Sequence, residues 1–170
     1  IVFPILKKTG KNFYLVYCPE RAVEGSALKE LYILPQVIGG IDNNSINKAV
    51  KIFKKITKKI VTTSNIETAE MIKYAANAFL ALKISYINEV ANLCEAVGAD
   101  VHLVAKGMGQ DGRISSKFLH PGPGFGGSCF PKDTQAFATL SRKKGVPMNT
   151  IDAAITTNNI QKTRMVKKLK

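Results

Sequence analysis

The stretch that decides the fold is residues 64–97, which read SNIETAEMIKYAANAFLALKISYINEVANLCEAV. No proline or glycine interrupts it and Gly98 follows it, so it predicts a single helix about 50 Å long. Ser64 and Glu67 have the spacing of a capping box, which predicts an N-cap at Ser64. One side repeats apolar residues at intervals of seven, namely Ile72, Phe79, Tyr86 and Leu93. Another side carries Met71, Ala75, Ala78, Leu82, Ser85, Asn88 and Asn92, so the helix needs cover from more than one neighbour.

The residues before this helix alternate between strand and helix patterns. Strands are expected at residues 13–18, at 36–38 ending in Gly39 and Gly40, and at 60–63. Helices are expected at residues 1–8, 26–32 and 43–59. Such alternation is typical of a parallel α/β sheet. The predicted fold class is therefore an α/β N-terminal part, residues 1–63, followed by an all-α part, residues 64–170, built on one long helix.

A glycine-rich segment interrupts the helical second part. Short helices are expected at residues 100–106, 132–144 and from about Asn149, and residues 122–133 read GPGFGGSCFPKD. Pro131 suits a first helical turn, so Cys129 is expected just before a helix N-terminus, where the dipole and free N–H groups favour a thiolate. Lys132 adds a cation and Asp133 a proton acceptor. The alternative is a buried structural cysteine in a glycine-rich bend.

The composition argues against several classes of protein. The net charge is +13, but the basic residues of 48–59 have the spacing of a solvated helix face and alternate with no aromatic residues, so no nucleic-acid partner is expected. No apolar run approaches the roughly 20 residues of a membrane span and no signal peptide is visible, so a cytoplasmic protein is expected. The three cysteines are widely spaced without a CxxC pair, which argues against a disulfide scaffold or a metal site and for a reducing compartment.

Two further groups of polar residues can carry chemistry. Lys73 and Asn77 are four apart and share a helix face, so they can direct a cation and an amide donor at one oxyanion. The alternative is a surface lysine beside a packing asparagine. Glu20 follows the strand expected at residues 13–18, and ligands collect beyond the carboxyl ends of parallel strands. The alternative for Glu20 and Glu24 is a solvated loop.

Residues 126–133, GGSCFPKD, resemble the active-site segment of UDP-glucose 6-dehydrogenases, a group within the UDP-glucose/GDP-mannose dehydrogenase family. The resemblance extends from about Phe13 to the C-terminus. It implies NAD as cofactor, with residues 1–63 as the C-terminal part of a Rossmann-like NAD-binding domain. Residues 64–170 would form the helical central domain and begin the linker to an absent C-terminal nucleotide-sugar domain. The resemblance also implies a homodimer through the long helix, residues 65–97.

The same resemblance implies a role for each candidate site residue. Cys129 would be the nucleophile, Lys73 and Asn77 would stabilise the oxyanion, Asp133 would serve as base and Glu20 would position water. Lys132 and Glu20 would lie toward the cofactor. The nucleotide-sugar would be held by Glu24, Arg113, Phe118, Leu119, His120, Phe125 and Gly126, with Arg113 reaching the sugar site of a neighbouring subunit.

The implied activity is an NAD-dependent four-electron oxidation of UDP-glucose to UDP-glucuronate through a cysteine thiohemiacetal and thioester. Ser128 favours glucose, because UDP-N-acetylhexosamine dehydrogenases usually carry Gly-Gly-His-Cys. Ala22 and Val23 depart from the common Phe-Leu-Arg run, which keeps a UDP-N-acetylhexosamine such as the mannosamine open. The chain alone is expected to be inactive. A hypothesis of another class is a helical dimerisation module without activity.

Two glycine patterns match the dinucleotide-binding fingerprint but stand in the wrong context. They are Gly107, Gly109 and Gly112, and Gly122, Gly124 and Gly127. Neither follows a strand and opens the helix of a βαβ unit, so neither is expected to hold a phosphate. The genuine fingerprint is expected upstream of Ile1.

Overall fold

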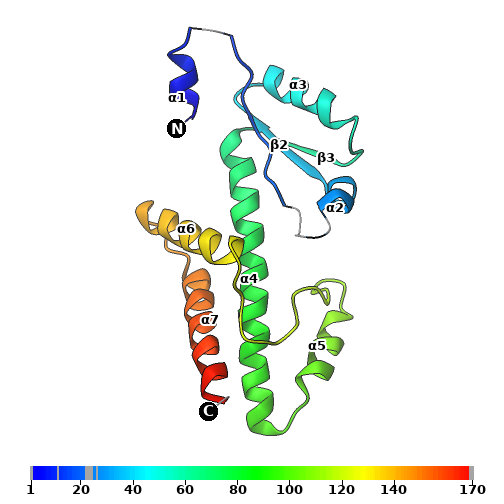
Figure 1. Cartoon of the computed structure of the whole chain (residues 1–170), viewed down its shortest axis with the longest axis vertical. Helices are drawn as coiled ribbons and strands as arrows, with labels where there is room; N and C mark the ends of the chain where they lie inside the picture. The colour runs from blue at the N-terminus through cyan, green and yellow to red at the C-terminus, as the bar shows by residue number, and fades with distance from the viewer. Residues whose placement is uncertain (1, 11, 22–24, 26, 169–170) are drawn as a thin grey trace. The chain divides into compact units, whose positions relative to one another are not determined.

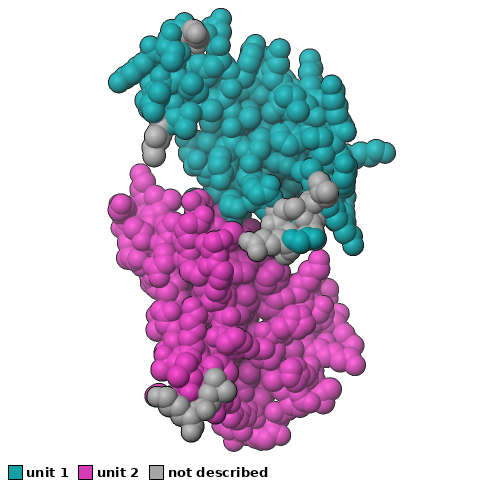
Figure 2. Space-filling model, viewed as in Figure 1, with its two compact units in different colours: residues 1–73 teal, residues 74–170 magenta. Residues whose placement is uncertain are grey.

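The protein comprises two compact units, Ile1–Lys73 and Tyr74–Lys170 (Figures 1 and 2). The computed structural model describes residues 2–10, 12–21, 25 and 27–168. Within them a small mixed sheet with helices precedes a mostly helical part that contains one long helix, α4, Ile66–Val97. This confirms the predicted fold class.

Unit 1 is built around a three-stranded sheet in the described residues. Its elements are α1 (Val2–Lys7), β1 (Val16–Tyr17), α2 (Ala27–Ile33), β2 (Gln36–Gly40), α3 (Asn43–Phe53) and β3 (Ile60–Thr63). β2 pairs with β3 in parallel, Gln36 facing Ile60, but β1 pairs with β2 antiparallel, Val16 facing Gly40. The predicted parallel sheet is therefore wrong at β1. The core lies between sheet and α3 and contains Ile38, Ile46 and Ala49.

Two elements of unit 1 are shorter than predicted because their backbone groups find other partners. β1 has two residues because the N–H of Leu15 turns to the Ser45 hydroxyl, 3.3 Å away on α3. α3 begins after Asp42, whose side chain accepts the Ser45 N–H at 2.6 Å, and it ends at Phe53. It cannot run to Lys59, because the Lys59 carbonyl accepts the N–H of Gln36, 2.7 Å away, at the entrance of the β2–β3 pair.

The ends of α4 are set by two local hydrogen-bond patterns. At the N-terminus the side chain of Asn65 accepts the N–H of Thr68 at 2.8 Å, so the predicted Ser64 cap is wrong by one residue. At the C-terminus Gly98 has φ of 74°, and the N–H of Ala99 donates to the Cys94 carbonyl at 2.9 Å. This is a Schellman ending, in which glycine takes the left-handed position without a steric penalty.

Unit 2 contains most of α4 with α5 (Val101–Gly109), α6 (Cys129–Lys143) and α7 (Asn149–Lys168). α5 extends beyond the predicted Lys106, and α6 begins at Cys129 instead of Lys132, so Pro131 is its third residue. The core between α4, α6 and α7 contains Ala78, Phe137, Ala138 and Ile151. Figure 1 shows α7 running beside α4, where the Ser85 hydroxyl donates to the Ala154 carbonyl at 2.8 Å.

One side of α4 stays uncovered within the described chain. Phe79, Tyr86 and Leu93, three of the residues that repeat at intervals of seven, are 60%, 49% and 63% exposed. The predicted need for more than one neighbour is met elsewhere on α4, by α6, by α7 and by the segment between α5 and α6 that Lys83 and Asn88 bind. Among the described residues, no helix is both long and apolar enough to cross a membrane.

Gly39 of β2 provides a test of how closely the start of α4 packs against the sheet. A Cβ on Gly39 would stand 2.5 Å from the Asn65 carbonyl oxygen and 2.7 Å from the Ala69 Cβ. We expect Gly39→Ala to lower the free energy of unfolding by about 1–3 kcal/mol, because backbone atoms must move to admit the methyl group. Urea denaturation measures the change.

Gly107→Ala is the matched control. Gly107 lies inside α5, and no heavy atom approaches within 4 Å of its added Cβ. Alanine favours a helix interior over glycine by about 1 kcal/mol, so this variant should be neutral or slightly stabilised. Equal stability of the Gly39 variant and the wild type would contradict the close approach of α4 to β2.

Candidate active site

Cys129 lies at the first turn of α6 with its side chain exposed. Ser128 before it makes no side-chain capping bond, and its hydroxyl lies 3.7 Å from the Cys129 sulfur. The N–H groups of a first helical turn have no partners within the helix, so the positive end of the helix dipole lies beside the thiol. Gly127, with φ of 73°, makes the turn that leads into α6. The sequence predicted Cys129 just before a helix, and the structure makes it the first residue of α6; its role as nucleophile stays a prediction.

Asp133 lies one turn further along the same face of α6. Asp133 is only 2% exposed, and its Oδ2 accepts a hydrogen bond of 2.6 Å from the Asn77 side-chain amide on α4. The ammonium of Lys132 lies 3.6 Å from the other carboxylate oxygen and is itself largely exposed. A buried carboxylate needs such a donor, and a charge-assisted bond of this length holds Asn77 in one orientation. The structure thus brings together Asp133 and Asn77 on the side of α6 that also carries Cys129.

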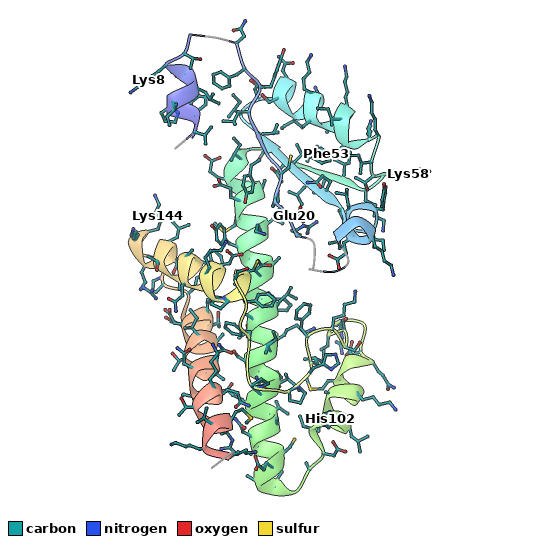
Figure 3. The ribbon with its side chains drawn as sticks, viewed as in Figure 1. Lys8, Glu20, Phe53, Lys58, His102 and Lys144 are labelled. Atoms are coloured by element: carbon teal, nitrogen blue, oxygen red, sulfur yellow. The ribbon has the colours of Figure 1, made fainter. Side chains whose placement is uncertain are left out.

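Lys73 lies one helical turn before Asn77 on α4, and its ammonium donates to the main-chain carbonyl of Glu20. Glu20 belongs to the loop after β1, labelled in Figure 3. A second contact, from the Arg21 guanidinium to the Pro35 carbonyl, fastens the same loop. Glu24 of this predicted group lies outside the described residues.

The reason given from sequence for a ligand near Glu20 does not hold in this sheet. Because β1 runs antiparallel to β2, with Tyr17 facing Gly39, the chain that leaves β1 heads toward the Gln36 end of β2 and away from Gly40, where β2 ends. A cavity of about 250 Å³ opens there, lined by Cys18, Glu20, Arg21, Glu30, Leu34 and Phe53 among others. Burial raises the pKa of the Cys18 thiol.

The predicted sugar-binding residues divide between a cavity and the core. An open cavity of about 510 Å³ is lined by Ile84, Lys117, Phe118, His120 and residues 121–124. Leu119 and Phe125 are instead 3% and 5% exposed, and they line none of it. Gly126 is exposed and also lies outside this lining. Phe118 adopts a left-handed φ of 65°, and its ring meets the edge of Phe130 with centroids 6.1 Å apart.

Arg113 projects from the loop after α5 with a side chain that is 90% exposed. Its guanidinium binds the Asp111 carboxylate, with 2.6 Å between Nη2 and Oδ2, and this bond lowers the pKa of Asp111. Lys83 of α4 donates to the carbonyls of Ile114 and Ser115 at 2.9 and 3.2 Å, which ties the same loop to the long helix. Sequence reasoning missed Lys83, since nothing distinguishes it from a surface lysine.

Sequence reasoning also missed three buried amides around residues 122–125. Asn88 of α4 accepts the Gly122 N–H at 2.7 Å, and Gln161 of α7 donates to the Gly122 carbonyl at 2.9 Å. Asn158 of α7 accepts the Phe125 N–H at 2.6 Å and donates to its carbonyl at 3.1 Å. The helical spacing of α7 could have revealed two of them, because Asn158 and Gln161 share its buried side with Ile151 and Ala154. We call Asn88, Asn158 and Gln161 the amide clamp.

No metal cluster is found among the described residues, and neither of the two glycine patterns lies in a strand-to-helix turn. No group of three or more His, Cys, Asp or Glu side chains among them could hold a metal ion, and His102 is exposed on α5 (Figure 3). Gly107 and Gly109 lie within α5, and Gly122 and Gly124 lie in the segment before α6, so neither glycine pattern forms a strand-to-helix turn. Neither pattern therefore provides the cradle that the pyrophosphate of a dinucleotide needs.

Comparison with known proteins gives a consistent result for both units. Residues 67–160 match the central domain of the UDP-glucose/GDP-mannose dehydrogenase family, and residues 1–57 match the NAD binding domain of that family. A UDP-glucose 6-dehydrogenase of Bacillus subtilis is 46% identical over 175 residues, which cover 99% of this chain and 37% of the relative. The chain thus spans a little over a third of the length of that relative.

Solved structures show the same similarity. A UDP-glucose dehydrogenase from Pyrobaculum islandicum matches with a TM-score of 0.88 and 35% identity, over 94% of this chain and 37% of that one. A UDP-D-ManNAc dehydrogenase from Pyrococcus horikoshii matches with a TM-score of 0.82 and 30% identity, over 93% and 38%. With more than half of its residues matched by the central-domain profile, the chain belongs to the UDP-glucose/GDP-mannose dehydrogenase family.

Proposed function

We propose that the protein carrying this chain is an NAD-dependent UDP-sugar dehydrogenase that oxidises UDP-glucose to UDP-glucuronate. The observation that carries the proposal is the exposed Cys129 thiol at the start of α6, one turn from a buried Asp133 bound to Asn77. A nucleophile, a proton acceptor and an amide donor are the groups that oxidation of an alcohol through a covalent acyl stage requires. The relative from Bacillus subtilis, which is 46% identical to this chain, is a UDP-glucose 6-dehydrogenase.

The reaction converts a primary alcohol and water into a carboxylate, with two hydrides transferred. NAD supplies the hydride acceptor at each transfer. At the aldehyde stage the Cys129 sulfur bonds to the carbonyl carbon and the oxygen becomes an oxyanion. Departure of the second hydride turns that adduct into a thioester, and water then displaces the sulfur to release the carboxylate. A thiolate suits both steps because it is a strong nucleophile and a good leaving group.

The neighbouring side chains have distinct roles in this proposal. One amide hydrogen of Asn77 is engaged by Asp133, which leaves the other available as a donor to the oxyanion. Asp133 accepts a proton directly or through water. Lys73 adds a positive charge on the same helix, and Glu20, whose carbonyl it binds, helps to position the hydrolytic water. Lys132 and Glu20 lie toward the cofactor, and Phe118, His120 and Arg113 contact the nucleotide-sugar.

The sugar and the assembly are part of the same proposal. The match to a UDP-D-ManNAc dehydrogenase favours a UDP-N-acetylhexosamine as the second candidate substrate. A homodimer through α4 would cover the exposed row of Phe79, Tyr86 and Leu93. The three unpaired thiols suit a reducing compartment, and we place the protein in the cytoplasm. Residues 1–63 would be the end of the NAD domain, and residues 64–170 would be the central domain.

Replacing the nucleophile tests the proposed chemistry. In the full-length protein, Cys129→Ser should lower the rate of UDP-glucuronate formation by at least about 10³-fold, because an alkoxide is a poor leaving group at the acyl stage. NADH release followed at 340 nm, together with product analysis, measures it. UDP-N-acetylmannosamine assayed in parallel separates the two candidate sugars.

Cys18→Ser is the control and should keep near wild-type turnover. Iodoacetamide should alkylate exposed Cys129 before half-buried Cys18, whose thiol pKa is raised by burial, and before buried Cys94. Full turnover by the Cys129 variant would refute its role as nucleophile.

Lys73→Ala tests whether this lysine acts on the transition state. Loss of one oxyanion donor typically lowers kcat by about 10²–10³-fold, and we expect that effect with a small change in KM for the UDP-sugar. Steady-state kinetics measures both constants, with Lys106→Ala on the exposed side of α5 as control. A change confined to KM would assign Lys73 to ground-state binding instead.

The dimer is tested by a charge on the exposed row of α4. Phe79→Asp should convert a dimer into monomers, because a carboxylate cannot be desolvated opposite its own counterpart in a symmetric interface. Sedimentation of the chain measures the mass, and Ile160→Asp, which changes an equally exposed residue of α7, should stay dimeric. A wild-type species of 18.5 kDa at all micromolar concentrations would remove the dimer from the proposal.

A further inference from the structure

The segment of residues 122–125 has no secondary structure of its own, yet its main chain is held by side chains from two helices. The amide clamp supplies four hydrogen bonds to the N–H and C=O groups of Gly122 and Phe125, at 2.6 to 3.1 Å. Backbone polar groups away from water require partners, and here helices α4 and α7 provide them. The position of the segment is therefore set from outside it.

The clamp side chains are buried and oriented. Asn88, Asn158 and Gln161 are 0%, 3% and 3% exposed. Gln161 is held at its other end, because its carbonyl oxygen accepts a 3.0 Å bond from the Asn92 amide on α4. A buried amide costs stability unless it is bonded, and Asn158 and Gln161 of α7 use both ends of their amides, which indicates that a particular geometry of the segment is being enforced. Asn88 differs, because its Nδ2 has no partner among the described residues.

Gly124 shows how closely the clamp fits the main chain. Its φ is 107°, and an added Cβ would lie 2.5 Å from the Oδ1 of Asn158. Asn158 thus contacts the backbone itself, at a distance that only glycine permits. The segment cannot shift toward α7, and its hydrogen bonds prevent it from shifting away.

The clamp positions one wall of the cavity of about 510 Å³. Residues 122–124 line that cavity together with Phe118 and His120, and none of Asn88, Asn158 and Gln161 reaches it. The buried ring of Phe125 also meets the edge of Phe130, with centroids 6.2 Å apart, and Phe130 follows Cys129 directly. One rigid support therefore serves both the cavity wall and the residue next to the thiol.

Resting on the function proposed above, we propose that Asn158 and Gln161 are positioning residues for UDP-sugar oxidation, acting through the main chain of residues 122–125. They touch neither the substrate nor the cofactor. They hold the cavity wall in the geometry that the bound nucleotide-sugar requires, so their loss affects the sugar substrate selectively. A purely structural role would instead change both substrates' constants and the stability together.

The test compares two neighbouring asparagines of α7 in the full-length protein. Asn158→Leu removes both bonds to Phe125, whereas Asn159→Leu changes an exposed side chain of the same type. We expect kcat/KM for UDP-glucose to fall by on the order of 10²-fold in the first variant, as misplaced substrate contacts do. KM for NAD should stay within about twofold, and the second variant should match the wild type.

Gln161→Met keeps about the same side-chain volume without adding a charge, and it serves if Asn158→Leu fails to fold. It removes the donor to the Gly122 carbonyl, and the loss of one such bond should lower kcat/KM for UDP-glucose about tenfold. Hydrogen exchange of the amides of residues 122–125 should accelerate in both clamp variants, with exchange elsewhere unchanged and the melting temperature lowered only by the few degrees that the lost hydrogen bonds cost.

Two results would overturn the inference. Clamp variants with the kinetics of the Asn159 control would show that the wall needs no support from α7. Parallel losses in KM for NAD, in kcat and in melting temperature would show that the clamp only stabilises the fold. A wild-type protein that oxidises neither UDP-sugar would refute the proposed function itself, and with it the positioning role. An active wild type whose clamp variants have unchanged kinetics would refute the positioning role alone.

Discussion

The hydrogen bond between Asn77 and Asp133 is the interaction on which the candidate site depends. It joins α4 to the first turn of α6 and compensates a carboxylate that is almost fully buried. The only cation near that carboxylate among the described residues is Lys132, at 3.6 Å and largely exposed, so the amide supplies most of the local stabilisation. If Asn77 were lost, an unpaired buried charge would remain, and the start of α6 with Cys129 would lose its register against α4.

A second dependence runs from the helices to the loops. The chain between α5 and α6 contains two left-handed residues that are not glycine, Ser115 and Phe118. Such conformations persist only when the surroundings impose them. Lys83 holds one of these loops through the carbonyls of Ile114 and Ser115, and the amide clamp holds the next. The precision of the cavity is therefore supplied by side chains of α4 and α7 rather than by the loop sequence.

Because helices support the loops through contacts distant in sequence, only part of the structure could be predicted from the sequence. The long helix and the C-terminal ends of α4 and α6 follow from local signals, since Gly98 and Gly145 both take the left-handed position that ends a helix. The cysteine segment is recognisable because its chemistry is contiguous. The direction of β1 was predicted wrongly, because a two-residue strand carries no signal of its partner's direction and its neighbouring N–H binds Ser45 on α3.

The clamp was missed for a related reason. Asn158 and Gln161 resemble ordinary polar positions of a surface helix until the register with Ile151 and Ala154 is noticed. Even then, the register indicates only that they are buried. Their partners are main-chain groups more than thirty residues away in the sequence. No side-chain pattern in residues 122–125 indicates that these groups bind α7.

Gly126 and Gly127 separate the clamped segment from α6, and no heavy atom lies within 4 Å of the Cβ that either would carry. Conformational freedom near the thiol is thus concentrated in two residues between rigid neighbours. Ordering one residue costs about 1–2 kcal/mol in backbone entropy, so fixing this joint around a bound sugar costs a few kcal/mol at most. Cys129 itself lies in the first turn of α6, which Asn77 holds through Asp133, so the sulfur follows a reacting carbon by rotation of its own side chain while the two glycines adapt the approach to it.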